Sequence, residues 1–172
     1  MGQIIAFPLP PTPYPDSTAD LDKAESILLV AIRWWCVSFR EDEDPVSRLA
    51  PDLETVGAAD VTFSINGLMS IVAYAVRRPV DIRCPGCPRL SDDEKHLLLA
   101  VSLTQAGDSD MAENVLRTTL LSAQGAELAL GPLEGLSALF AKARLLLSRR
   151  RFPSDDQITD DSREARLPPA LH

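Results

Sequence analysis

Proline placement constrains this 172-residue chain more than any other feature of its sequence. Five of its 14 prolines fall between Pro8 and Pro15, where each removes a backbone donor and fixes φ, which favours polyproline II or irregular structure. The C-terminal end combines charge and proline without apolar periodicity, a composition typical of disorder. We therefore expect a flexible Pro-rich arm at residues 1–19, a single helical domain at 20–151 and a disordered, charged tail at 152–172.

The first helix is predicted between the arm and an acidic run. Asp20 or Asp22 can cap a helix that runs to about Arg40, because apolar residues recur within it at spacings of three and four. The acids Glu41–Asp44 follow, and because four carboxylates at a helix C-terminus oppose the macrodipole, they predict a loop. Pro45 directly after an aspartate fits the first residue of a second helix.

The stretch Asp60–Arg78 supports two interpretations. Apolar residues alternate with polar ones before Asn66-Gly67, a pair that favours a hairpin turn. The same apolar residues also keep helical spacing through that pair, and the part after it is apolar on both faces of a strand. We therefore predict a helix ended by Pro79, in which Gly67 costs about 1 kcal/mol relative to alanine unless close packing needs it.

Three further helices are predicted towards the C-terminus. Ser91 and Glu94 form a capping box for a helix that stops at Gly107, and Asp108 begins a second helix, which gives an antiparallel hairpin. Gly131-Pro132 is expected to open the last helix, and Arg149–Arg151 to close it. The pattern as a whole predicts an all-α fold, a compact bundle of about five helices.

Residues 94–121 resemble one tetratricopeptide hairpin. Leu99-Ala100, Leu103, Gly107 and Ala112 stand where that repeat places its leucine, small residue, large apolar residue, turn glycine and packing alanine. One period of 34 residues away from the turn glycine lie Ala73 and Ala141, so no second copy follows. Because at least three repeats are usually needed for a stable solenoid, we interpret the match as coincidental, in an ordinary helical hairpin.

A second resemblance covers the segment before the predicted Ser91 helix. Arg77-Arg78-Pro79, followed by the run Cys84–Glu94, is similar to small helical proteins of α-proteobacteria that have no assigned activity. The resemblance covers about a third of the chain. It implies a compact helical domain and nothing about catalysis.

The most specific chemical motif is Cys84-Pro85-Gly86-Cys87. Two thiolates separated by a Pro-Gly bend can both bind one Zn²⁺, and Cys36 and His96 could complete a closed site of three cysteines and one histidine. Strong zinc motifs bring a second close pair of cysteines, which this chain lacks. Cys36 on an apolar helix also suits a small buried residue, and His96 a half-exposed one.

A redox role for the same motif is disfavoured by its position. Catalytic Cys-x-x-Cys pairs usually place the first cysteine at a helix N-terminus after a strand, which lowers its pKa. Here Pro88 follows the second cysteine, the next helix begins near Ser91, and no strand is predicted before it. Cys-Pro-x-Cys resembles the glutaredoxin motif in those four residues alone.

Charge and composition exclude several function classes. The net charge of −8 and pI near 4.7 disfavour nucleic-acid binding by phosphate neutralisation. The most apolar stretch, Ile27–Phe39, contains the charge of Arg33 and is shorter than the roughly 20 residues of a membrane-spanning helix. With no phosphate-binding loop or nucleophile motif, and with one of the two histidines in the tail, we predict no catalytic residues and no cofactor other than the zinc considered above. The absence of a signal-peptide pattern predicts a cytoplasmic protein.

Adjacent tryptophans suggest how such a protein acts. On one helix Trp34 and Trp35 point about 100° apart, so if one lies in the core the other lies at its edge, where tryptophan often anchors an interface. Arg77 and Arg78 could hold an acidic partner, although their place at a helix C-terminus also accounts for them. We expect a non-enzymatic adaptor or regulator that binds a protein partner or forms a homodimer; the alternative is a zinc-binding helical regulator or sensor with a Cys84/Cys87 knuckle.

Overall fold

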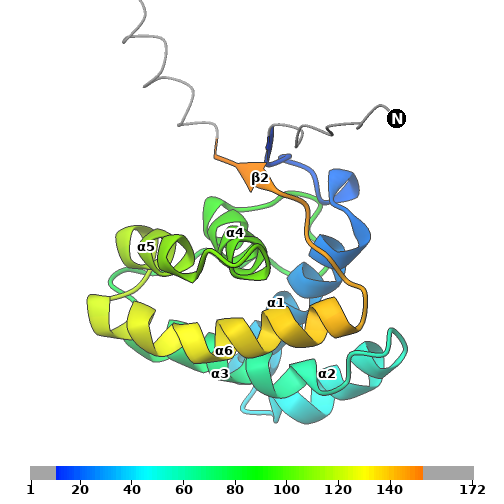
Figure 1. Ribbon diagram of the computed structural model, residues 1–172. Helices are drawn as coiled ribbons and strands as arrows, with labels where there is room; N and C mark the ends of the chain where they lie inside the picture. Colours follow the sequence, from blue (N-terminus) through cyan, green and yellow to red (C-terminus); the bar gives the residue numbers. More distant parts are fainter. Residues whose placement is uncertain (1–10, 153–172) are drawn as a thin grey trace, which may run out of the picture. The chain divides into compact units, whose positions relative to one another are not determined.

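The computed structural model describes residues 11–152, and it confirms the all-α prediction (Figure 1). Two strands of two residues each, β1 (Thr12–Pro13) and β2 (Arg150–Arg151), pair in parallel. The six α-helices of this part of the chain are α1 (Lys23–Arg40), α2 (Pro45–Glu54), α3 (Val61–Ala75), α4 (Asp92–Gln105), α5 (Ser109–Thr119) and α6 (Ala123–Lys142).

The chain divides into two units, and the helices belong to the unit Pro15–Arg149. The described part of the other unit is the strand pair with its flanks. Part of the segment that we expected to be a flexible arm belongs to the helical unit, because the 3₁₀ turn Thr18–Asp20 begins with an N–H···O bond of 2.8 Å from Thr18 to the Pro88 carbonyl. The first ten residues of that arm and the tail beyond Phe152 lie outside the described residues.

Capping residues fix where most helices begin, as predicted. Asp22 accepts a hydrogen bond from the Glu25 N–H at the start of α1, and the Glu25 carboxylate accepts one from the Asp22 N–H, so both form a capping box. Ser91 forms the predicted box at the start of α4. Asp44 caps α2 and Asp108 caps α5. Each cap satisfies backbone donors that the first helical turn leaves unpaired.

Residues 61–75 form the predicted helix α3 rather than a hairpin, and the reason is its packing on α6. A Cβ added at Gly67 would lie 3.3 Å from the Pro132 ring, and one added at Gly125 would lie 2.6 Å from the Ala75 Cβ. The two helices therefore approach more closely than larger side chains would permit. Asn66 belongs to this packing as well, because its side-chain oxygen accepts a hydrogen bond of 2.9 Å from Trp35 Nε1.

Three helix boundaries differ from the prediction, and two of them are the ends of α6. The last helix begins at Ala123, capped by Ser122, and contains Pro132; it does not open at Gly131-Pro132. A proline inside a helix gives up one backbone hydrogen bond, and here packing of the ring on α3 offsets that loss. Left-handed backbone at Arg144, with φ of 59°, follows the end of α6, so Arg149–Arg151 do not close it.

In two other helices, too, a proline does not mark the helix boundary. Pro51 lies inside α2, where the preceding Asp44-Pro45 pair already provides the cap and first residue. The α3 helix ends at Ala75, before the expected stop at Pro79. The Arg77 N–H donates instead to the Leu120 carbonyl at 3.1 Å, a contact with the end of α5 that takes the chain out of helical geometry.

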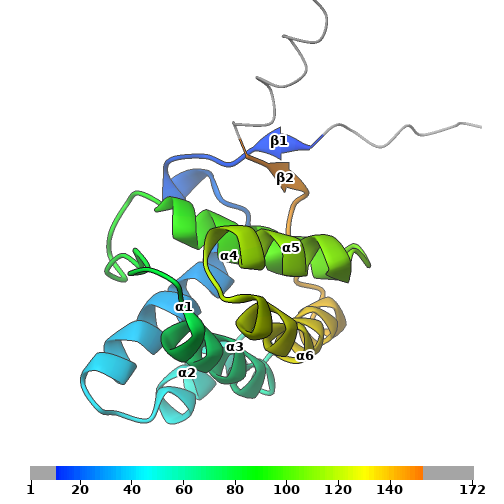
Figure 2. The same cartoon turned by 90° about the vertical axis from the view of Figure 1, so that its left-hand side faces the viewer.

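One aliphatic core lies inside the helical unit. The α4–α5 hairpin packs on α6, α3 runs along α6, and α1 packs on α2, as Figures 1 and 2 show from two sides. Every helix contributes side chains that are fully or almost fully buried, among them Leu28, Ile32, Leu53, Ile65, Leu97, Leu116, Leu133 and Phe140. None of the helices in residues 11–152 has the length and apolarity to cross a membrane.

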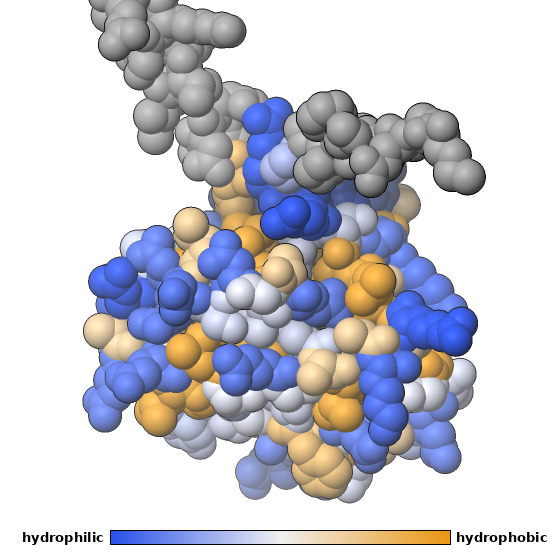
Figure 3. Space-filling view, viewed as in Figure 1, coloured by the Kyte–Doolittle hydropathy of each residue, from blue (hydrophilic) through white to orange (hydrophobic). Residues whose placement is uncertain are grey.

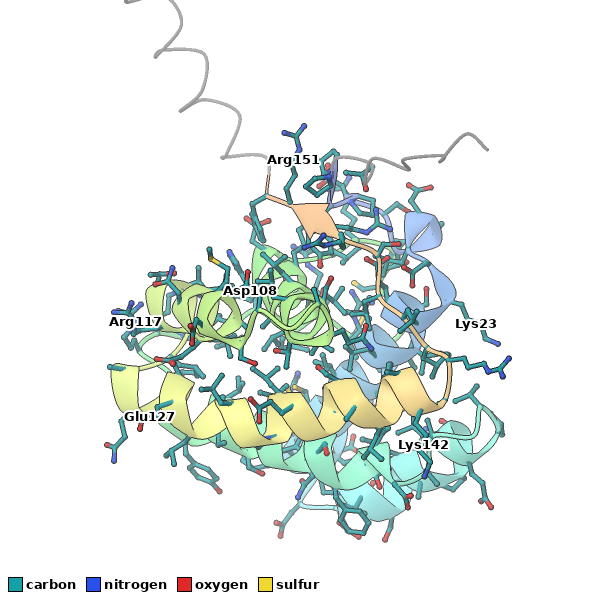
Figure 4. The ribbon with its side chains drawn as sticks, viewed as in Figure 1. Lys23, Asp108, Arg117, Glu127, Lys142 and Arg151 are labelled. Atoms are coloured by element: carbon teal, nitrogen blue, oxygen red, sulfur yellow. The ribbon has the colours of Figure 1, made fainter. Side chains whose placement is uncertain are left out.

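Charged residues mostly lie at the surface of the helical unit. The face seen in Figure 3 is mainly hydrophilic, with apolar side chains in small separate areas. In Figure 4 Lys23, Arg117, Glu127 and Lys142 point away from the helices. Arg33 on α1 is an exception, because its side chain is only 2% exposed.

Candidate functional site

Trp34 and Trp35 diverge on α1, as their predicted 100° separation requires. Trp35 is buried, donates its hydrogen bond to α3 and stacks on Phe39 with 4.9 Å between ring centroids. Trp34 is half-buried at the edge of α2, where the Arg48 guanidinium carbon lies 4.1 Å from the centre of its ring. One tryptophan thus belongs to the core and the other to the surface.

The Trp34 ring lines an apolar groove between α1 and α2. The groove has a volume of about 400 Å³, and Val30 on its α1 side is 43% exposed. Its floor includes buried Leu49 and Leu53. The residues that line this groove, called the α1/α2 groove below, are Ser26, Ile27, Val30, Ala31, Trp34, Leu49, Asp52, Leu53, Thr55 and Val56.

Asp52 is the one carboxylate among the residues that line the α1/α2 groove. The chain around it is acidic, because residues 41–56, which connect α1 to α2 and form α2, carry six carboxylates and one arginine. That arginine, Arg48, lies 3.7 Å from Asp52 and over the Trp34 ring, so its charge is already partnered. Hydrogen bonds from Ser47 and Val46 hold the pKa of the Asp44 carboxyl below its ordinary value. The groove therefore belongs to a segment with an excess of negative charge.

A second polar centre lies on the other side of α1, where Arg33 meets the N-terminus of α4. Arg33 Nε donates to Glu94 Oε1 at 2.7 Å and Arg33 Nη2 donates to Glu94 Oε2 at 2.9 Å, and the Glu94 side chain is fully buried. The same guanidinium donates to the carbonyl oxygens of Cys87 at 2.7 Å and Arg89 at 2.9 Å. A bidentate pair with further hydrogen bonds is the form in which a buried ion pair is tolerated.

Glu94 and its neighbour Asp93 fix the segment between α3 and α4. Glu94 accepts the N–H groups of Arg83 at 3.0 Å and Ser91 at 2.9 Å. Asp93 accepts the Asp81 N–H at 2.8 Å and binds Arg78 through both oxygens, at 2.6 and 2.9 Å. Burial alone would raise the pKa of Asp93, but these hydrogen bonds outweigh it and lower the pKa. The segment between α3 and α4, which contains no helix, is thus held through Arg78, Asp81, Arg83 and Ser91.

The four predicted zinc ligands are not brought together. Cys84 is exposed and Cys87 half-buried on the anchored segment, whereas Cys36 lies on α1 beside Trp35 and Met69, and His96 lies in α4. Within residues 11–152, no three side chains of the metal-binding types gather at one place. The segment meets α1 through carbonyl oxygens bound by Arg33 instead of through sulfur, which accounts for the difference from the sequence hypothesis.

Arg77 and Arg78 are both engaged in the structure. Arg77 Nη2 donates to the Thr118 carbonyl at 2.8 Å, which ties the end of α3 to α5. The hydrogen bonds to Asp93 raise the pKa of Arg78. Both side chains therefore join elements. Neither lies in the last turn of a helix, the alternative drawn from the sequence, because α3 ends at Ala75.

Comparison with known proteins adds no assignment to this geometry. No family model, no curated protein and no solved structure matches the chain. Sequence reasoning found Trp34 but missed Arg33, which it treated only as a charge within an apolar stretch. A charged residue on a predicted core face needs a buried partner, and this requirement together with the buried capping box at Glu94 is the signal that could have found the pair.

Proposed function

We propose that the chain is a non-enzymatic cytoplasmic protein that acts by protein–protein interaction and binds a basic, apolar helical segment of a partner in the α1/α2 groove. The observation that carries the proposal is the half-exposed Trp34 at the edge of an apolar groove that Asp52 also lines, beside the acidic segment 41–56. The three cysteines are free thiols, which fits a reducing compartment.

The apolar groove and the negative charge of residues 41–56 favour a basic, apolar helix for separate reasons. A tryptophan that is partly buried before binding can bury the rest of its ring against a partner, and such residues dominate interface energetics. Apolar residues spaced along one face of a helix match a groove between two helices. Lysine or arginine on the flanks of that helix would be attracted by Asp52 in the lining and by the excess of carboxylates in residues 41–56.

Charge argues for another protein as the occupant and against a second copy of this chain. The chain carries a net charge of −8, and a symmetric dimer through this groove would bring two copies of the acidic segment 41–56 towards one another. Like charges brought together in an interface cost several kcal/mol. A basic segment gains attraction from the same carboxylates, and its association accelerates as salt is lowered.

The test uses a helical peptide with leucine on one face and lysine on the other, and a matched peptide with glutamate in place of lysine. Fluorescence anisotropy should show that the lysine peptide binds more tightly and that added salt weakens it. Trp34→Ala should weaken binding by about 2 kcal/mol, or roughly thirtyfold in Kd. Phe63→Ala is the control, because Phe63 on α3 is 67% exposed but does not line the groove.

Three results would overturn the proposal. Equal binding of both peptides would remove the electrostatic part, and equal loss from Trp34→Ala and Phe63→Ala would place the contact elsewhere. Sedimentation that shows a dimer which Trp34→Ala dissociates would assign the groove to self-association.

A further inference from the structure

The turn that contains Cys84 and Cys87 brings two thiols of different exposure together. The Cys87 N–H donates to the Cys84 carbonyl at 3.0 Å, which closes a four-residue turn. Such a turn keeps its first and last Cα atoms within about 7 Å, inside the range that a disulfide spans. Cys84 is exposed to solvent and Cys87 is half-buried.

The turn is held from both sides before any bond forms between the sulfurs. The Arg83 N–H donates to Glu94 just before the turn, and Arg33 binds the Cys87 and Arg89 carbonyls within it and after it. Because Arg33 and Glu94 are buried and paired, this frame is part of the folded core. The entropy cost of bringing the two thiols together is therefore already met by folding.

Exposure decides which of the two thiols meets an external reagent. Cys84 is exposed and Cys87 is half-buried, so Cys84 is the thiol that a small disulfide reaches first. A hydrogen bond with Cys84 raises the pKa of Cys87, although the charges of Arg33 and Arg83 act in the opposite direction. Burial raises the pKa of the third thiol, Cys36, to about 11, so it does not compete at neutral pH.

We infer that Cys84 and Cys87 form a reversible dithiol–disulfide pair that exchanges with small-molecule disulfides of the glutathione class. The Cys84 thiolate attacks one sulfur of the small disulfide, a Cys84 mixed disulfide forms, and one small thiolate leaves. Cys87 then loses its proton to water and attacks Cys84 Sγ, which expels the second small thiolate. Two protein thiols are oxidised and one disulfide is reduced to two thiols, so electrons balance. The inference is independent of the α1/α2 groove.

The chain supplies its own analytical fragment. Trypsin cleaves after Arg83 and Arg89, so the peptide Cys84–Arg89 contains both cysteines of the turn and no other. The full-length protein is equilibrated with reduced and oxidised glutathione, alkylated and digested. A disulfide makes this peptide about 2 Da lighter and resistant to alkylation. A synthetic peptide of the same six residues measures what the local sequence does without the frame.

The folded protein should hold the disulfide in buffers at least about tenfold more reducing than those that open it in the synthetic peptide, because the frame raises the effective concentration of one thiol at the other. Equal midpoints in the two would overturn the inference. Cys87→Ser should accumulate one glutathione on Cys84, while Cys36→Ser should oxidise as the unaltered protein does. A Cys36→Ser protein that forms no disulfide would equally overturn it.

Discussion

At the scale of single residues, Arg33 determines how the segment between α3 and α4 is held. Its guanidinium binds the fully buried Glu94 carboxylate at the start of α4, the Cys87 carbonyl in the cysteine turn and the Arg89 carbonyl just after that turn. A buried charge left without its partner is among the most destabilising changes in a protein core. The stability of the helical unit and the geometry of the turn are therefore coupled through one side chain.

Arg33→Met should lower the free energy of unfolding by about 3–5 kcal/mol, because Glu94 would remain buried without a counter-charge. Urea denaturation measures the change, and Arg40→Met on the exposed side of α1 should alter stability by less than about 0.5 kcal/mol. Replacing both partners, Arg33→Met with Glu94→Leu, should recover part of the loss. A loss at Arg33 no larger than that at Arg40 would contradict the account.

His96 predicts a specific dependence of stability on pH. Burial lowers the pKa of this imidazole below its ordinary value near 6.5, although Asp93 and Asp92 act in the opposite direction. The unfolded chain therefore takes up a proton on this residue before the folded chain does, so folding stability decreases as pH falls below about 6.5.

Urea denaturation at several pH values between 7.5 and 5 should show this decrease, and His96→Gln should flatten it. Asp93 serves as a contrast, because its lowered pKa gives stability that is present above the unfolded value of 3.8 and lost as pH falls through the folded one. If His96→Gln leaves the slope between pH 7.5 and 5 unchanged, burial of the imidazole is not its cause.

At the scale of elements, α1 distributes three consecutive residues to three neighbours. Arg33 meets the start of α4, Trp34 the α1/α2 groove and Trp35 the side chain of Asn66 on α3. Steps of about 100° along a helix produce this separation. One helix therefore supports the anchored cysteine turn, the proposed partner site and the core at once.

The contact of α3 with α6 makes a testable prediction at this scale. Gly125→Ala should destabilise the protein by about 1–3 kcal/mol, because the new methyl group would overlap Ala75, 2.6 Å away. Gly131→Ala in the same helix should be neutral or stabilising by up to about 1 kcal/mol, because nothing lies within 4 Å of its added Cβ. Thermal unfolding of both variants measures the two changes in stability. A Gly125→Ala protein that is no less stable than the Gly131→Ala protein would contradict this account of the packing.

Local signals in the sequence predicted the parts of the fold that depend on local chemistry. The capping residues Asp22, Asp44, Ser91 and Asp108 all act as caps, because a cap requires only its own first turn. Pro132 misled the prediction because its cost within α6 is offset by a contact with α3, which is distant in sequence.

The candidate site also has features that the sequence predicted and features that it did not. Divergence of Trp34 from Trp35 follows from helical geometry, so the sequence predicted it. The α1/α2 groove and the Arg33–Glu94 pair depend on how α2 and α4 pack on α1, across separations that periodicity does not report. Within residues 11–152 the residues of the zinc hypothesis do not form a group of metal-binding side chains, and spacing alone does not show which face of an anchored segment its sulfurs occupy.

At the scale of the whole molecule, charge and apolar surface combine to favour one kind of partner. The chain has a net charge of −8, and residues 41–56, which include Asp52 in the groove that Trp34 lines, carry six of its carboxylates. Negative potential at long range would bring a basic segment to the molecule, and burial of the tryptophan ring would hold it there. The account stands on both contributions acting at one place.

Nuclear magnetic resonance tests that claim most directly, by titrating the isotopically labelled full chain with the leucine–lysine peptide. The account predicts that the largest backbone shift changes occur in residues 27–34 and 49–56 and that Trp34→Ala removes them. Changes centred on the exposed face of α3, or none at saturating peptide, would contradict it.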